Sequence, residues 1–509
     1  MVSPFNKANV FDLTHEHLLT CNMGQLIPVE LVEVVPGDTF KQHTDMFMRL
    51  EALIAPIMHR CDVKFWSFYV PNRTIMDGWE GYITGGPDGT DDTVKPYMVA
   101  PEGGYAPGSL ADYLGLPLGV GGYKHSALPI RMYQKIYNEW FRDENLIDEV
   151  ALSTADGLDT TTSLDLQNVA WEKDYFTNAL PTPQRGPASY LPFSVSAPVV
   201  TDGTQPTFSN GFDLTDRGLV NTLGEQQIAI SGSTSGSSRP LQFGNNTGLR
   251  ADLSQATSVT VNQMRLAFQV QKFLEKNMRG GARLVEWTLS HFGVRIPDGR
   301  LQRSEFLGGG RSPVVISPVE QTSSTDATSP QGNLAGRGSS AQRTHKWMKS
   351  FVEQGFVMTL MTVIPRTLYS QGLHRLWSRE TRYDEYLPVF AHLGEQEVKA
   401  KELCLTGDSS YDESNWGFND RFSELRHIPS TAHGQFRAGE SLDYWTMARQ
   451  FDLENPPQLN GDFVTADPTR RVFAVTDESV DTIEVQVMHH LKAIRPLPKY
   501  GNPGLIDHD

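Results

Sequence analysis

The chain has 509 residues and a formal net charge of −16 at pH 7, with 44 glycines, 31 prolines and three cysteines. This acidic balance excludes a protein whose whole surface coats nucleic acid, although local basic patches are compatible with it. The cysteines, Cys21, Cys61 and Cys404, are far apart and form no CxxC pair, so neither a disulfide framework nor a zinc site is expected. No stretch approaches about 18 uninterrupted apolar residues, and no basic-then-apolar leader opens the sequence, so we predict neither a membrane span nor a signal peptide.

Four stretches have the pattern of β-strands. QLIPVELVEVVPGD (25–38) is β-like and ends in a Pro-Gly-Asp turn signal. VKFWSFYVP (63–71) and GFVMTLMTVIP (355–365) are apolar at both parities and stop at a proline, which is typical of strands covered on both faces. TIEVQVMHHLKAIRPLP (482–498) alternates with a period of two, interrupted on its apolar face by His489. It therefore predicts a half-buried antiparallel strand.

Two stretches predict helices between these strands. In SALPIRMYQKIYNEWFRDEN (126–145), Pro129 suits the first helical turn and large apolar residues recur at helical spacing. In VNQMRLAFQVQKFLEKNMRGG (261–281), the final two glycines provide a stop. One stripe of that helix comprises Val261, Met264, Phe268, Gln271, Leu274 and Met278. Such a stripe is typical of a core-facing surface, so we predict no cofactor site there.

Two polar tracts, roughly 188–258 and 321–342, are dense in Ser, Gly, Thr and Asn and show little periodicity. Long tracts of this kind are unusual inside compact domains and are often binding loops or insertions. The scattered short strands favour a mainly β fold, a β-sandwich or jelly roll with large insertions and a few helices. We divide the chain into a core segment at 1–187, a surface insertion at 188–258 and the remaining core at 259–509.

No pattern of catalytic residues stands out. HEH (15–17) and His489-His490 have no metal-site spacing, and adjacent strand histidines point to opposite faces, so satisfied or surface histidines are expected. GGGRS (308–312) lacks the phosphate-loop pattern and is expected to be a flexible turn. We therefore predict no enzyme, no metal and no cofactor. A carbohydrate-active or carbohydrate-binding β-sandwich stays open as the alternative.

Basic residues interleaved with aromatics could follow the phosphates and stack on the bases of single-stranded nucleic acid. Their alternative is solvated charge or salt bridges. The candidate DNA contacts fall in two clusters: Arg366, Arg375 and Arg379, and then Arg470, Arg471, Lys492, Arg495 and Lys499.

Several long strings resemble the major capsid proteins of microviruses, the small tailless phages with circular single-stranded DNA, and most closely their gokushovirus-like branch. They are FDLTHEHLLTCNMGQLIPVELVEVVPGDTF, LIAPIMHRCDVKFWSFYVPNRTIMDGWEGYITGG, WEKDYFTNALPTPQRG, HFGVRIPDGRLQRSEFLGGG and IRPLPKYGNPGLIDHD. The resemblance implies an eight-stranded viral jelly roll that assembles as sixty copies in a T=1 icosahedral shell, without catalysis. It also implies a location in the virion after assembly in the bacterial cytoplasm. The implied partners are the packaged DNA, a small basic DNA-associated protein, a pilot or minor capsid protein, a scaffolding protein and a host receptor.

The resemblance gives two further segments an expected role. Prolines in the strap at 174–186, which Trp171 precedes, reduce the entropy that an extended arm loses on docking, so the strap is a candidate subunit contact. Packing of the strap on its own subunit is the alternative. Its candidate residues are Trp171, Tyr175, Phe176, Leu180, Pro181 and Pro183. The 188–258 tract matches, in position, an insertion that forms a three-fold protrusion in gokushovirus-like relatives, and a disordered loop without a receptor role is the alternative. Its candidate host-facing residues are Thr204, Phe208, Asn210, Phe212, Ser233, Phe243 and Asn245.

Overall fold

The computed structural model describes residues 8–187, 261–320 and 334–499, and six short strands between 199 and 251. It separates into two compact units, one comprising 1–183 with 276–509 and the other 184–275. The predicted insertion at 188–258 lies inside the second unit, and the three-part division of the chain stays a prediction. None of the helices in the described residues is long and apolar enough to cross a membrane.

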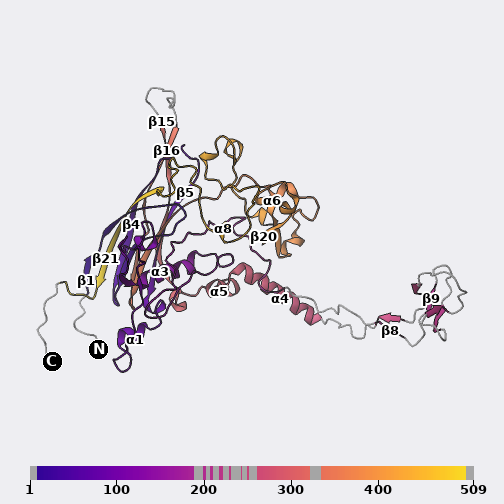
Figure 1. Cartoon of the computed structure of the whole chain (residues 1–509), viewed down its shortest axis with the longest axis horizontal. Coiled ribbons are helices and arrows are strands. Elements are labelled where there is room, and N and C mark those ends of the chain that lie inside the picture. The colour runs from indigo at the N-terminus through magenta and orange to yellow at the C-terminus, as the bar shows by residue number, and fades with distance from the viewer. Residues whose placement is uncertain are drawn as a thin grey trace. The chain divides into compact units, whose positions relative to one another are not determined.

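The first unit is built on two antiparallel sheets (Figure 1). The seven-stranded sheet contains β1 (Asn9–Asp12), β2 (His15–Cys21), β4 (Thr39–Leu50), β15 (Val315–Glu320), β16 (Leu334–Arg343), β17 (Trp347–Ser350) and β21 (Ile483–Arg495). The four-stranded sheet contains β3 (Ile27–Val34), β5 (Cys61–Pro71), β14 (Glu305–Pro313) and β18 (Gly355–Pro365), in the order β14-β5-β18-β3. Two small sheets pair β6 (Tyr97–Val99) with β7 (Lys124–Ser126), and β19 (Glu395–Lys399) with β20 (Asn415–Asp420).

The connections between these strands are those of a jelly roll. β1 and β2 pair with successive parts of β21, and β16 and β17 pair with successive parts of β4, so each pair occupies one strand position. Along the chain, β2 lies in the seven-stranded sheet, β3 in the four-stranded sheet, β4 in the seven-stranded sheet and β5 in the four-stranded sheet. β14 pairs with β5 in the four-stranded sheet. The chain then passes through β15, β16 and β17 in the seven-stranded sheet, β18 in the four-stranded sheet and β21 in the seven-stranded sheet. This route confirms the predicted mainly β, jelly-roll class. Long insertions follow β5 (72–304) and β18 (366–482).

The core between the two sheets follows the predicted alternation. Met46 and Met48 of β4 and Val485 and Val487 of β21 pack in one cluster with apolar residues of β3, β5 and β18. Because successive side chains of a strand point to opposite faces, the residues between them face outward. β5 and β18 are buried at nearly every position, which confirms that both are covered on two faces.

The Pro-Gly-Asp turn predicted after the first strand also forms. It leads from β3 into β4, and Gly37 has a φ of 94°, which a residue without a Cβ adopts readily.

The α-helices of the described residues are short apart from α4. They are α1 (Trp79–Thr84), α2 (Leu110–Tyr113), α3 (Leu128–Ile136) continued by a π-helical turn (Tyr137–Phe141), α4 (Val261–Gly280), α5 (Leu284–Phe292), α6 (Ala400–Leu403), α7 (Ser409–Asp412) and α8 (Gly461–Val464). The predicted α3 is confirmed, with Pro129 in its first turn and Ile130, Tyr133 and Tyr137 buried. It covers the four-stranded sheet, since its side chains pack with Phe68 of β5 and neighbouring apolar residues.

α4 forms over the predicted residues, but the prediction that its stripe faces a core is wrong within this chain. Of the stripe, only Met278 is buried, while Val261 and Phe268 are exposed. Periodicity shows that one face of a helix is apolar, and it does not show what covers that face.

GGGRS is also different from its prediction: these residues form part of β14 and pair with β5. A Cβ at Gly309 would lie 2.1 Å from the carbonyl oxygen of Phe65. The glycine is therefore needed for close approach of the two strands, and not for a turn.

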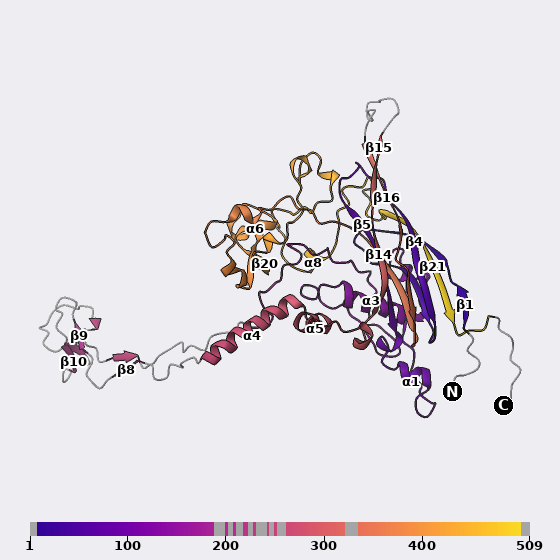
Figure 2. The same ribbon diagram turned by 180° about the vertical axis from the view of Figure 1, so that it is seen from behind.

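The insertion after β18 folds with the strap into a region of its own core, grouped around α6, β20 and α8 away from the long strands in Figure 2. Tyr175 and Phe176 of the strap pack there against Tyr369, Val398 and Leu403.

The second unit contains β8 (Val199–Thr201), β9 (Thr207–Ser209), β10 (Arg217–Asn221), β11 (Ile228–Ile230), β12 (Gln242–Phe243) and β13 (Leu249–Ala251). They form one sheet in the order β11-β10-β9-β12 and a β13-β8 pair. Phe208 and Phe243 are paired positions of β9 and β12. The other host-facing candidates, Thr204, Asn210, Phe212, Ser233 and Asn245, lie outside the described residues.

The second polar tract, 321–342, is also described only in part. Residues 321–333 lie outside the described residues. Residues 334–342 belong to β16 and are not a loop, because the polar stretch is paired between β15 and β4.

Candidate genome-contact and subunit-interface residues

Arg366, a candidate DNA contact, belongs to a cluster of ion pairs at the ends of β5 and β18. Its guanidinium pairs with Glu172, which precedes the strap, and lies 3.4 Å from Asp62. Lys64 and Arg311 also pair with Glu172, and Arg311 lies 2.5 Å from Asp62. Burial would raise the pKa of Glu172, but the surrounding cations outweigh this and lower it. The charge of Arg366 is thus already balanced inside the subunit.

Arg375 and Arg379 are likewise paired within the inserted region. Arg375 lies 3.4 Å from Glu402, and Arg379 lies 3.3 Å from both Glu385 and Glu424. Both arginine side chains are largely buried. A buried guanidinium that is already paired with carboxylates has few hydrogen-bond donors left for an external phosphate.

The arginines near the C-terminus bind backbone carbonyls. Arg470 donates to the carbonyl oxygens of residues 477, 478 and 480, and Arg471 donates to those of residues 446 and 448. Arg495 donates to the carbonyl oxygen of Glu33 and lies 3.2 Å from Asp38. These three side chains hold loops and strand ends in place. Charge reversal at Arg470 or Arg471 would therefore disturb folding as well as any DNA contact.

Lys492 and Lys499 are the exposed members of the candidate set. Lys492 lies on β21 directly opposite Lys41 of β4, on the outward face of the seven-stranded sheet. On the same face, His490 lies opposite His43. Sequence reasoning missed Lys41 and His43 because they are more than 400 residues from their partners. Only the register of β4 with β21 brings them together.

The strap residues differ in exposure. Trp171, Tyr175 and Phe176 are buried within their own chain, which is the alternative that the sequence left open for them. Leu180 is partly buried and forms a backbone bridge with Phe418. Pro181 is exposed and Pro183 is partly exposed. Among the candidate residues, only this proline-containing end is exposed enough to contact a neighbouring subunit.

The cysteines and His489 are buried and have structural surroundings. All three cysteines are buried, and burial raises the pKa of Cys61 to about 12 and that of Cys404 to about 11. His489 is fully buried, with ring nitrogens 2.9 Å from the carbonyl oxygen of Val29 and 3.0 Å from Thr44 Oγ1. It is therefore a satisfied core histidine, as the sequence predicted.

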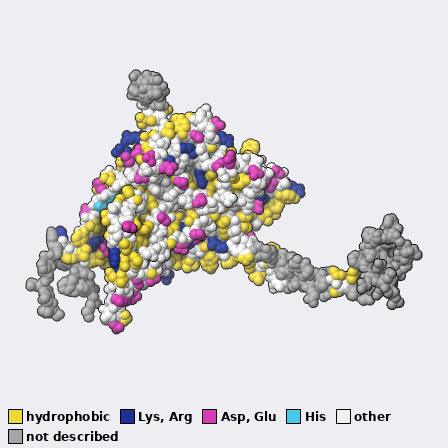
Figure 3. Space-filling model, in the orientation of Figure 1, with side chains coloured by type: hydrophobic (Ala, Val, Ile, Leu, Met, Phe, Trp, Pro, Cys, Tyr) yellow, Lys and Arg dark blue, Asp and Glu magenta, His cyan; other side chains and the backbone are white. Residues whose placement is uncertain are grey.

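Charged side chains of both signs are mixed over the face of the first unit shown in Figure 3. The jelly-roll connections and their long insertions place the chain among double-sheet β proteins, the fold class that contains viral shell proteins and lectins, and the mixed charge does not distinguish between these two. Comparison with known families separates the two. Residues 4–505 match the family described as capsid protein (F protein), and the chain belongs to that family.

Three relatives extend the match over nearly the whole chain. The capsid protein VP1 of Bdellovibrio phage phiMH2K is 37% identical over 499 residues, covering 95% of this chain and 93% of the relative. That of Chlamydia phage 1 is 36% identical over 570 residues, covering 97% and 95%. That of Spiroplasma virus 4 is 33% identical over 526 residues, covering 97% and 94%. The microvirus resemblance is thereby confirmed: the protein is a structural capsid protein of the virion and not an enzyme.

Proposed function

We propose that the protein assembles as sixty copies into a closed T=1 icosahedral shell around circular single-stranded DNA. The observation that carries self-assembly is apolar surface on the helices. Leu266 and Phe268 of α4 and Phe292 of α5 are 64%, 62% and 67% exposed. Large apolar side chains exposed in such numbers mark interaction sites, and in a capsid protein further copies of the chain are the partners that would cover them.

The DNA requires local contacts, because a subunit of charge −16 cannot neutralise a genome through its overall charge. The outward face of the seven-stranded sheet carries Lys41 and Lys492 directly opposite each other. Like charges in such a cross-strand pair destabilise a sheet. Asp12 of β1, which lies opposite Lys492 on its other side, offsets part of the repulsion, and a phosphate lying between the two lysines would relieve more of it. This pair supports a genome contact better than the internally paired arginines do. A small basic protein would supply the remaining positive charge, and scaffolding and pilot proteins complete the proposed partners.

Replacing both lysines with glutamine is expected to lower the amount of nuclease-protected DNA per particle without reducing the yield of particles. Both side chains are exposed, so the loss of charge removes phosphate contacts and leaves the core intact. The measurement is the DNA-to-protein ratio of purified particles after nuclease treatment. Lys124→Gln, an exposed lysine of β7, is the matched control. An unchanged ratio in the double variant would exclude this face as a genome contact.

The second unit is proposed as the outer, host-attachment element. By its internal contacts it forms a compact unit of its own, which supports a division between shell and attachment. Deleting residues 196–256 should leave uniform closed particles visible by electron microscopy but reduce adsorption of the phage to host cells. Loss of particles, with a correctly folded deleted chain, would show that this segment serves assembly instead.

A further inference from the structure

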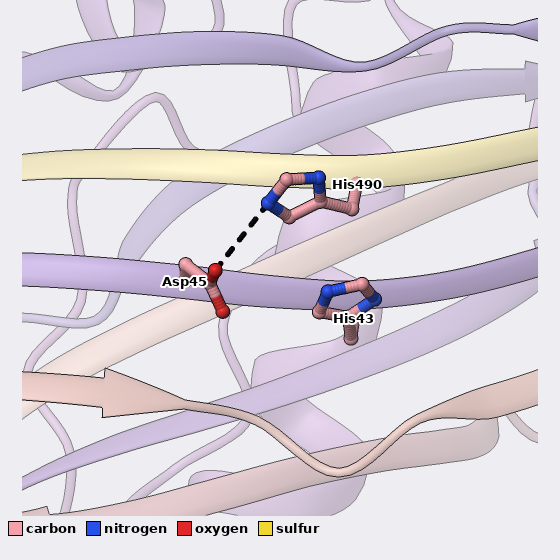
Figure 4. A group of neighbouring side chains, drawn as sticks. All are labelled: His43, Asp45 and His490. Carbon is pink, nitrogen blue, oxygen red and sulfur yellow. Dashed lines mark ion pairs between the residues drawn. The ribbon is translucent and has the colours of Figure 1, made fainter.

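His43, Asp45 and His490 lie together on the outward face of the seven-stranded sheet (Figure 4). His43 and Asp45 are two residues apart on β4, so their side chains share a face, and His490 is the residue of β21 directly opposite His43. One ligand atom from each of the three side chains lies within 4.8 Å of the other two. His490 Nε2 is 3.3 Å from Asp45 Oδ2, and the two imidazole rings stack with centroids 4.6 Å apart.

We propose that these three side chains bind one divalent transition-metal ion of the Zn²⁺ class, with water as the fourth ligand. Imidazole nitrogen and carboxylate oxygen are ligands that Zn²⁺ accepts, and three protein ligands plus water form an open tetrahedral site. Ligand atoms of a tetrahedral ion with bonds of about 2.0–2.2 Å lie a little over 3 Å apart, as Nε2 and Oδ2 already do. The two rings are nearly parallel, with an interplanar angle of 10°, so the His43 ring has to turn about its side-chain bonds for one of its nitrogens to reach the same point.

The neighbouring histidine cluster does not offer the same chemistry. His489 points into the core and its two ring nitrogens already face Val29 and Thr44. His15 and His17 of β2 pack around His489, on the other side of the sheet from His490. Among the described residues, His43, Asp45 and His490 form the group whose ligand atoms converge.

Arg343 is the competitor of a bound ion. Its Nε and Nη2 lie 2.6 Å and 2.7 Å from the two oxygens of Asp45. The Arg343 side chain is 65% exposed, and it can leave Asp45 without opening the sheet. An ion that displaces it would keep the carboxylate neutralised and would add positive charge to the face that carries Lys41 and Lys492. A bound ion would therefore take these three ligands and would have to displace Arg343 from Asp45.

Zinc titration of the full-length chain at pH 7.5, followed by competition with a chromophoric indicator, tests the proposal. We expect one ion per chain at this site. In His43→Gln and His490→Gln the affinity should fall at least about tenfold, because even outer-sphere partners have effects of this size. Arg343→Gln should tighten binding by about two- to fivefold, since it removes an exposed ion pair that competes for Asp45. His427→Gln, at an exposed histidine elsewhere, should leave the affinity unchanged.

Cobalt(II) provides a second readout that folding alone would not produce. Four-coordinate Co²⁺ bound at this site should give intense visible absorption in the wild-type chain and lose it in the His43→Gln/His490→Gln double variant. Circular dichroism of the same samples shows that the variants are folded. Absence of a saturable site in the wild type, or full retention of binding in the folded double variant, would overturn the proposal. Unchanged or weaker binding in Arg343→Gln would overturn the competitor role.

Discussion

Replacing Arg131 with methionine is expected to lower the free energy of unfolding of the unassembled chain by about 3–5 kcal/mol. Arg131 of α3 and Asp159 are both fully buried, with Arg131 Nε 2.7 Å from Asp159 Oδ2. The other guanidinium nitrogens donate to the carbonyl oxygens of Ile75 and Ala155. Methionine retains most of the volume but leaves the carboxylate charged and unpaired in a low-dielectric interior. Urea denaturation followed by tryptophan fluorescence measures the loss.

Arg73→Met is the matched control, because Arg73 pairs with Glu353 at the surface. The two side chains of this pair are 41% and 38% exposed, and water replaces the lost partner. An exposed pair contributes about 0.2–1 kcal/mol, so the control should remain near the wild type. Equal losses of the free energy of unfolding in the two variants would show that the buried Arg131 pair stabilises the fold no more than the exposed Arg73 pair does.

The Arg131 effect should also depend on pH. Burial alone would raise the pKa of Asp159, but hydrogen bonds from Thr162 and Arg131 outweigh it and hold the pKa below its ordinary value of 3.8. Since the folded value is lower than the unfolded one, the ionised carboxylate stabilises the fold above pH 3.8. That contribution disappears as the pH falls through the folded pKa. The difference between wild type and Arg131→Met should therefore shrink in acid.

The sheets could be predicted from local pattern because a strand has a period of two. Alternation in β21 indicated which residues face the core, and the apolar runs of β5 and β18 indicated burial on both faces. The scattered strands favoured a β-sandwich or jelly roll in general, whereas the eight-stranded viral form of it came from the resemblance to capsid proteins. The order of strands in a sheet depends on contacts between distant segments, which no local pattern contains.

Two failures have the same physical origin. GGGRS looked like a turn because glycine is common in turns, yet Gly309 is in β14 because a side chain there would collide with the carbonyl oxygen of Phe65. The stripe of α4 indicated a core-facing helix, yet Phe268 is exposed in the isolated chain. In both cases the local pattern does not contain the surroundings of the residue, which are a neighbouring strand for Gly309 and open surface for Phe268.

The candidate contacts show the same limit. Arg471 had the appearance of an available cation, but its guanidinium is occupied by backbone carbonyls that composition does not reveal. Conversely, His43 attracted no attention until strand register placed it opposite His490. A pattern search finds ligands that are close in sequence, and here two strands separated by most of the chain supply them.

Replacing Phe176 with alanine is expected to lower the free energy of unfolding by about 3–5 kcal/mol. Phe176 is 3% exposed, and its ring centroid lies 4.9 Å from that of Tyr369 in an edge-to-face arrangement. Since Phe176 belongs to the strap and Tyr369 to the insertion after β18, the cavity would weaken the packing that joins these two segments. The same urea experiment measures this loss, and limited proteolysis within residues 366–482 should become faster.

Pro181→Ala separates stability from assembly in the same strap. Pro181 is exposed, so its replacement should change the free energy of unfolding by less than about 1 kcal/mol. If the proline-containing end of the strap contacts a neighbouring subunit, this variant should fold normally but give fewer particles, because the free arm would lose more entropy on docking. Phe176→Ala would instead reduce particles only in proportion to the folded protein that remains. Normal particle yield from Pro181→Ala would confine the role of this proline to its own subunit, whereas a stable Phe176→Ala chain would contradict the packing described for the strap.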